Sequence, residues 1–291
     1  MKDATRFRPL LFTVLAPVFW STGGVGLRLV DASAWQVLFW RSLFMTIFLF
    51  SWSLIKDGPR ILPTYYRTVV QGKWVTIFFT LSILFYVFSI TNTTVADSLL
   101  IQGTAPILIV FLGWLLLGEP LKKVTIAGLL AVAIGITVIM IPSLSKGGLS
   151  GNFFGLAKAS AFAAGTIAIR KRKSVALLPA ITSAAAFTTL ISLFFVPSLS
   201  VTPISLLILC YLGFFQTGIA FLFFTSWSGK LTSSITGLIV ILEAVLGPLW
   251  VWLFLDIRPP DTTLLGGAII IIALVTHTLL FYRGESPAGK A

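Results

Sequence analysis

The chain is dominated by long apolar runs that are separated by short polar stretches. A helix needs ~20 residues to cross the ~30 Å hydrocarbon core of a bilayer, and the runs have about this length. The pattern therefore predicts an all-α integral membrane protein with ten transmembrane helices. The expected spans are 10–28, 33–55, 74–92, 94–117, 124–142, 152–170, 176–196, 203–227, 232–254 and 263–282.

Composition indicates that the solvent of this chain is lipid rather than water. Hydrophobic residues make up 57% of the 291 residues and charged residues only 10%, with a mean hydropathy of +1.01. A soluble domain contains roughly 25% charged residues, so this chain has too few to cover a surface exposed to water. Ten spans take ~200 residues, which leaves short connections and no room for a soluble domain.

Lysine and arginine are distributed unevenly between the two sides of the predicted bundle. With a cytoplasmic N-terminus, sixteen of the 21 fall on the cytoplasmic side and only Arg28, Lys146 and Arg258 on the other, while Arg41 and Lys158 fall inside spans. Because cytoplasmic loops are enriched in Lys and Arg, both termini are expected to be cytoplasmic. This placement explains the net charge of +12 without a nucleic-acid partner. The apolar start has the charge pattern of a signal peptide, but the absence of a convincing cleavage site favours a retained first helix.

Two parts of the chain match each other at a fixed offset. Residues 113–128 align with 251–266 at a shift of 138, which places Trp114 on Trp252, Leu117 on Leu255, Thr125 on Thr263 and Gly128 on Gly266. The first helix of each half aligns at a shift of 142, which places Trp20 on Phe162, Gly23 on Gly165 and Arg28 on Arg170. The consistent order of these matches predicts a duplicated unit of five helices.

The duplication divides the chain into five parts. They are a cytoplasmic N-terminal segment (1–9), a first five-helix repeat (10–142), a linker loop (143–151), a second five-helix repeat (152–282) and a cytoplasmic tail (283–291). Because five is odd, the second repeat enters the membrane from the opposite side, so the two repeats are expected to be inverted. Inverted repeats suit a carrier that works by alternating access.

Short motifs stand out in both halves of the chain. They are Phe19-Trp20-Ser21-Thr22-Gly23-Gly24, Trp40-Arg41, Pro106 with Gly118-Glu119-Pro120, and Leu242-Glu243. These motifs resemble the EamA family of the drug/metabolite transporter superfamily, and the resemblance covers roughly residues 8 to 282. It implies a multi-pass carrier of the bacterial inner membrane, often an exporter of amino acids or related metabolites, with a central cavity between the halves. The sequence departs from the family pattern at Ala244, where a proline is usual, and at Asp256-Ile257, which replaces a Gly-Glu pair.

Three charged residues fall inside the predicted spans. Glu243 and Arg41 lie near the middle of their helices, and Lys158 lies about a third of the way along the sixth. A charge at the bilayer centre costs ~2.5–3.5 kcal/mol on insertion scales, so such residues normally face the protein interior and have a partner. They are expected to form either a substrate or proton site or an ion pair that only fixes the packing of the helices.

Other polar and aromatic residues at similar depth complete the expected binding site. Trp20 lies among the glycines of the first helix, Phe162 is its repeat counterpart, and Gln216 lies in the middle of the eighth helix. The predicted substrate-binding residues are Trp20, Arg41, Phe162, Gln216 and Glu243, and the predicted ion-pair or proton site is Glu243, Arg41 and Lys158. Asp97, in the outer half of the fourth helix, is expected to be solvated.

The chain carries no motif for ATP hydrolysis, metalloprotease or serine-hydrolase chemistry, and it has one histidine and one cysteine. No cofactor, metal or catalytic role is therefore expected. The predicted function is a secondary transporter, an exporter of small polar metabolites such as amino acids, whose partners are the lipid bilayer and a small-molecule substrate. An intramembrane enzyme that acts on lipid or a small amphipathic substrate is the alternative. The sequence leaves open the substrate, the direction, proton coupling and oligomerisation.

Overall fold

A computed structural model describes residues 2–120, 123–142, 148–172, 175–227, 230–231 and 233–283. The described chain consists of helices joined by short connections, with no strand among these residues. Most of the expected linker loop and nearly all of the expected C-terminal tail lie outside the described residues. Nine helical stretches in the described chain are long and apolar enough to cross a membrane, and the apolar helix at Ile239–Leu255 supplies a tenth. The predicted all-α membrane fold is confirmed.

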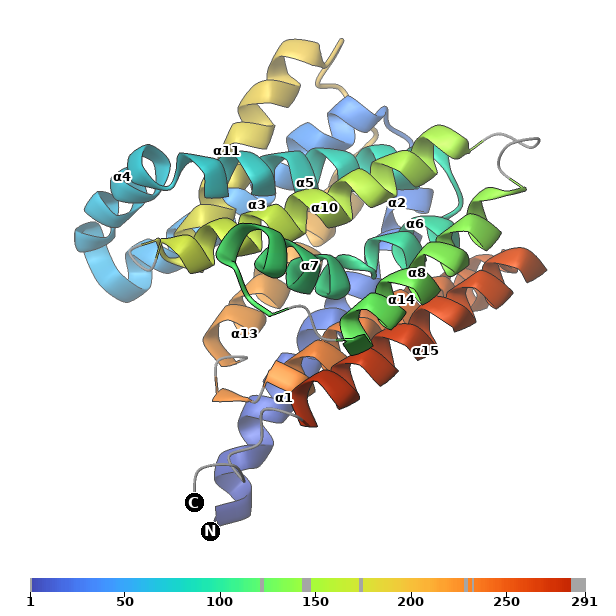
Figure 1. The fold of residues 1–291 in the computed structure, drawn as a ribbon. Coiled ribbons are helices and arrows are strands. Elements are labelled where there is room, and N and C mark those ends of the chain that lie inside the picture. The colour runs from blue at the N-terminus through green and yellow to red at the C-terminus, as the bar shows by residue number, and fades with distance from the viewer. Residues whose placement is uncertain are drawn as a thin grey trace, which may run out of the picture.

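Figure 1 shows the arrangement of the helices. In chain order they are α1 (Lys2–Ser21), α2 (Gly23–Leu29), α3 (Ala34–Asp57), η1 (Gly58–Ile61), α4 (Leu62–Gln71), α5 (Lys73–Asn92), α6 (Val95–Gln102), α7 (Ala105–Leu117), α8 (Lys123–Met140), α10 (Leu149–Lys171), α11 (Leu177–Phe195), α12 (Pro203–Tyr211), η2 (Leu212–Ile219), α13 (Ala220–Trp227), α14 (Ser233–Leu255) and α15 (Asp261–Arg283).

Three expected spans are interrupted helices rather than continuous ones. The first breaks at Thr22, between α1 and α2, and the fourth breaks at Gly103–Thr104, between α6 and α7. Pro106 explains the second break, because it has no backbone N–H for an intrahelical hydrogen bond and therefore fits the first turn of a new helix. The eighth span changes from α12 to the π-helical η2 and back to α13. The hydropathy pattern also missed α4, which is too short to span.

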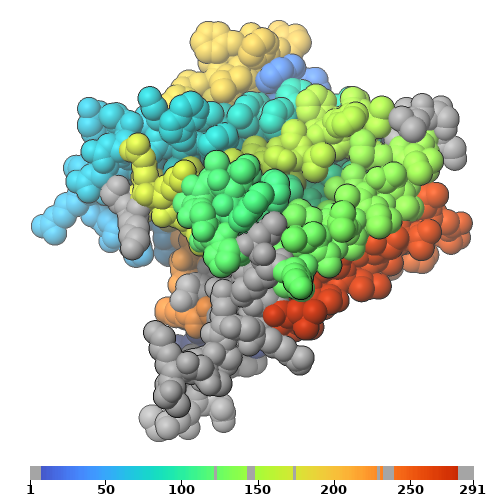
Figure 2. Space-filling view, viewed as in Figure 1, coloured from blue at the N-terminus to red at the C-terminus, as the bar shows by residue number. Residues whose placement is uncertain are grey.

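Large apolar side chains cover the outside of the bundle. Phe194 is 84% exposed, Ile55 82% and Leu207 72%. Figure 2 shows one face, on which α8 and α15 lie side by side along the surface. Soluble monomers rarely expose such extensive apolar surface, whereas a bilayer solvates it. The surface therefore suits a chain embedded in lipid.

The helix contacts repeat between the two halves of the chain. Spans one and eight pack together through α1 and α13, and their counterparts, spans six and three, pack through α10 and α5. Spans one and nine pack through α1 and α14, as do spans six and four through α10 and α7. Three further contacts each join a span to its own counterpart in the other half. They are α3–α11, α6–α14 and α8–α15. These particular contacts are thus the same when the two halves are exchanged.

The ends of α7 and α14 share an unusual backbone conformation. Gly118 follows α7 with φ +69°, and Asp256 follows α14 with φ +53°, the one non-glycine residue with positive φ in the described chain. The shift of 138 relates these two positions. Asp tolerates the left-handed region better than most residues because its short side chain can bond locally. The departure at Asp256 therefore preserves the geometry of the helix end.

Candidate functional site

Arg41 lies at the centre of a buried polar network. Its side chain on α3 is only 5% exposed, and its Nη2 donates a hydrogen bond to Gln216 Oε1 at 3.1 Å. The guanidinium carbon lies 4.9 Å from the centre of the Tyr86 ring on α5, a cation–π geometry. The structure thus brings Arg41 and Gln216, two of the predicted site residues, into direct contact.

Gln216 connects this network to the break in the first span. Its Nε2 donates to the carbonyl oxygen of Trp20 at 2.8 Å, next to the end of α1. Gln216 itself is 1% exposed and belongs to η2. π-Helical turns occur often at functional sites, and interrupted helices form the binding sites of many carriers. The chain therefore departs from regular helix on both sides of this hydrogen bond.

Gly23 allows the network to pack against α2. A Cβ atom at this position would lie 2.5 Å from the Tyr86 hydroxyl and 2.7 Å from Gln216 Nε2. Real Cβ contacts are essentially never this short, so an alanine here would displace both polar groups. Gly24, the next residue, would instead meet Val95 Cγ1 at 2.4 Å. Only the first of these two glycines borders the polar network.

The other two predicted charges, Lys158 on α10 and Glu243 on α14, are partly buried. They lie within electrostatic range of each other and of Arg41. No ion pair within 4.0 Å joins any two of the three in the described part of the chain. The Lys158 ammonium lies 5.6 Å from the centre of the Phe162 ring. The three charges therefore act on one another electrostatically without a direct ion pair in the described part of the chain.

Trp20 and Phe162 occupy equivalent positions in two separate interfaces. The Trp20 ring meets the Phe221 ring edge-on at 5.0 Å, and the Phe162 ring meets Phe79 edge-on at 5.6 Å. The shift of 142 that relates Trp20 to Phe162 also relates Phe79 to Phe221. The contacts of Phe79 and Phe221 were not predicted. The shift of 142, extended to the third span, would have matched these two positions to each other.

Three donors beside or within the network are buried without a hydrogen-bond partner among the described residues. They are Trp20 Nε1, Arg41 Nε and the Tyr86 hydroxyl, on side chains that are 9%, 5% and 6% exposed. Buried donors in folded proteins nearly always have a partner, so an unpaired group needs an explanation. A ligand or water with acceptor atoms would supply one.

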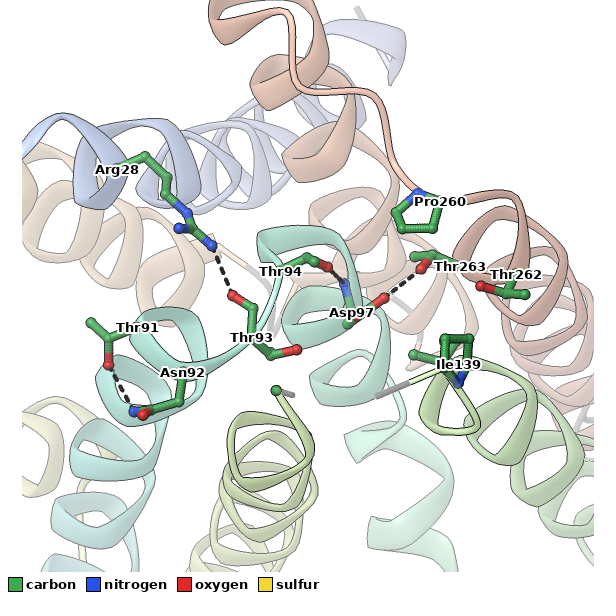
Figure 3. Close-up of a pocket in the computed structure, with 12 residues that line it drawn as sticks. Arg28, Thr91, Asn92, Thr93, Thr94, Asp97, Ile139, Pro260, Thr262 and Thr263 are labelled. Atoms are coloured by element: carbon green, nitrogen blue, oxygen red, sulfur yellow. Dashed lines mark hydrogen bonds between the residues drawn. The ribbon is translucent and has the colours of Figure 1, made fainter. Parts of the chain in front are cut away.

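A cavity of about 540 Å³ (Figure 3) lies at the end of the bundle where α5 is joined to α6, and no residue of the Arg41 network lines it. We call this the Arg28 end. Its lining is Arg28, Thr91, Asn92, Thr93, Thr94, Asp97, Ile139, Pro142, Gly148, Pro260, Thr262 and Thr263. None of the predicted site residues belongs to this lining, and hydropathy gave no signal for it.

Asp97 is buried in the wall of this cavity and is not solvated as expected. It is 5% exposed, and the Thr263 hydroxyl donates to its Oδ1 at 2.5 Å (Figure 3). The Asp97 backbone amide donates to Thr94 Oγ1 at 3.0 Å, so the Thr94 side chain caps the N-terminus of α6. The correction has a simple cause, because α15 from the second half covers this face of α6.

The opposite end of the bundle carries an ion pair between the halves. Arg170, in the last turn of α10, bonds both carboxylate oxygens of Glu119, which follows α7. Arg172 nearby donates to the carbonyl oxygen of Gln71 at the end of α4. We call this the Arg170 end. At this end, the ion pair connects the segment that follows the fourth span to the end of the sixth span.

The fold and site define a multi-pass helical membrane protein with charged and polar side chains buried between its helices. Residues 7–141 match the model of the EamA-like transporter family, which confirms the resemblance for the first half of the chain and suggests a membrane transporter. A solved structure described as "Crystal structure of protein" aligns with a TM-score of 0.65 at 21% identity, covering 96% of this chain and 99% of the other. At this identity the alignment shows a shared fold. No curated protein matches the chain.

Proposed function

We propose that the protein is a secondary carrier that exports small polar metabolites, such as amino acids, by alternating access between two inverted five-helix repeats. The observation that carries this proposal is the group of buried and partly buried charged side chains that helices of both halves contribute. Arg41 comes from the first half, and Lys158 and Glu243 come from the second. Burying three charges in a membrane without direct pairing is costly, and a ligand that passes through the protein would pair with them.

The polar groups suggest how a zwitterion would bind. Arg41 and Lys158 would attract a carboxylate, and Glu243 would attract an amino group or carry a proton. The Trp20 and Tyr86 donors would reach acceptor atoms of the ligand. The aromatic pairs at Trp20 and Phe162 would line the two sides for an amphipathic substrate.

The packing supports the inverted repeats. Contacts that persist when the halves are exchanged, together with the matching left-handed residues Gly118 and Asp256, are what a duplicated unit would produce. Two such halves can exchange conformations and so open the site to either side in turn. The excess of Lys and Arg at the Arg170 end supports a bacterial inner-membrane orientation with this end and both termini in the cytoplasm.

Counterflow in proteoliposomes tests the proposal. Proteoliposomes that contain the purified protein are loaded with unlabelled amino acids, amines or nucleosides in turn. They should accumulate the labelled form of a substrate and leave it chemically unchanged. Glu243→Gln and Arg41→Ala should each lose this accumulation, while Arg258→Gln, which changes an exposed arginine paired with Asp261, should keep it.

Two results would contradict the proposal. If the Glu243→Gln and Arg41→Ala proteins both insert normally and transport at the wild-type rate, the binding site is wrong. If a solute or lipid is recovered as an altered product, the intramembrane enzyme is the better reading.

A further inference from the structure

Arg28 is a cation with unused hydrogen-bonding capacity in the wall of the 540 Å³ cavity. Its Nη2 donates to the carbonyl oxygen of Thr93 at 2.8 Å, which holds the side chain against the turn between α5 and α6 (Figure 3). A guanidinium has five N–H donors, and this is the one hydrogen bond that its side chain makes in the described chain. No carboxylate forms an ion pair with it there.

The proposed repeat explains why Arg28 has no acidic partner among the described residues. Its counterpart Arg170 is bound to Glu119. The position equivalent to Glu119 in the second half is Ile257, which follows the left-handed Asp256 just as Glu119 follows Gly118. The helix end is therefore preserved while the carboxylate is missing. Arg170 is therefore neutralised by a carboxylate, whereas its counterpart Arg28 faces a cavity.

The rest of the lining suits a small polar solute. A volume of about 540 Å³ lies within the roughly 300–1,000 Å³ range of ligand sites. Thr262 is exposed, whereas Asp97, the carboxylate of this lining, is already bonded by Thr263. Among the residues of this wall that the structure describes, Arg28 is thus the group that has both charge and free donors.

We propose that the Arg28 cavity is a second solute site, in which Arg28 binds the carboxylate group of a small organic acid or amino acid. A solute carboxylate would take the place that Glu119 occupies beside Arg170, since the guanidinium fork matches two carboxylate oxygens. The site is separate from the buried network of Arg41. It deepens the proposed function because it would hold substrates at the Arg28 end before or after they pass that network.

A cysteine reporter tests binding at this cavity without measuring transport. Thr262→Cys in a Cys210→Ser background places a single thiol in the lining. The purified protein is labelled with a negatively charged or a positively charged methanethiosulfonate reagent, in the presence of acetate, L-alanine or L-alaninamide. Labelling by the anionic reagent should be faster than by the cationic one, and acetate and L-alanine should slow it, whereas L-alaninamide should not.

Three further substitutions assign the protection to Arg28. Arg28→Gln should require at least about tenfold more carboxylate for the same protection, because hydrogen bonds to a charged group are lost. Ile257→Glu supplies the missing partner and should have the same effect. Arg258→Gln, at the same end but outside the lining, should leave protection unchanged.

The outcomes separate this proposal from the transport function. Equal protection in Arg28→Gln and the parent protein, or equal protection by L-alaninamide, would overturn the second site whatever the transport assay shows. Carboxylate protection that depends on Arg28 in a protein inactive in counterflow would support the site and contradict the proposed carrier function.

Discussion

Replacing Gly23 with alanine should damage the polar network more than the fold. The new Cβ would lie 2.5 Å from the Tyr86 hydroxyl and 2.7 Å from Gln216 Nε2, so both groups must move. Overpacking costs typically ~1–3 kcal/mol, and the better helix propensity of alanine returns ~0.8–1 kcal/mol. The net cost to stability from packing is therefore up to about 2 kcal/mol.

Gly23→Ala should also weaken the binding of substrate. When Gln216 moves, its hydrogen bonds to Trp20 and Arg41 are lost, and a buried group left unpaired costs ~1–3 kcal/mol. This corresponds to about 5- to 150-fold in substrate affinity, if the network binds substrate. Counterflow at several substrate concentrations measures the affinity, and thermal unfolding in detergent measures the stability.

Gly24→Ala is the matched control because it creates an equally tight contact of a different kind. Its Cβ would lie 2.4 Å from Val95 Cγ1, so it strains α2 to a similar degree without touching the network. We expect both variants to unfold at lower temperature and only Gly23→Ala to lose affinity. Equal losses of transport in the two variants would refute the role of the network, as would wild-type transport in Gly23→Ala.

Three other substitutions test separate parts of the structure by thermal unfolding. Thr263→Val should lower stability by ~1–3 kcal/mol because the buried Asp97 carboxylate loses a hydrogen-bond donor, and Thr263→Ser should restore it; no difference between the two would contradict that bond. Asp256→Val should cost ~1–2 kcal/mol because a β-branched residue is strained at φ +53°, so an unchanged unfolding temperature would argue against the left-handed helix end. Glu119→Gln should cost at most ~1 kcal/mol, because the carboxylate and Arg170 are 38% and 45% exposed; a larger loss would mean that this pair holds the halves together.

The sequence predicted the class of fold because lipid imposes a simple rule. Each span must be long, apolar and helical, since no water in the bilayer core can satisfy free backbone groups. Hydropathy therefore located the spans, including the weakly marked turn before Val95, where α6 begins. It did not predict the breaks at Thr22 and Gly103 or the π-helical η2, because these depend on packing by other helices.

The predicted site is partly assembled by the structure. Depth and polarity singled out Trp20, Arg41 and Gln216, and the fold joins them through two hydrogen bonds. Their binding role stays a prediction. The same reasoning placed Asp97 in solvent, because depth along a helix does not reveal which neighbour covers it. Thr263 of α15 does so from 166 residues away.

By itself, the sequence determined that the chain is a helical membrane protein, where its spans lie, and which polar residues fall at their middle. These properties follow from the solvent and are local to each segment. Only the tertiary structure decided which residues meet. It paired Arg170 with Glu119, left Arg28 facing a cavity, and gathered Arg41, Lys158 and Glu243 from three helices. Contacts between distant segments depend on how the helices pack, which hydropathy along one chain does not encode.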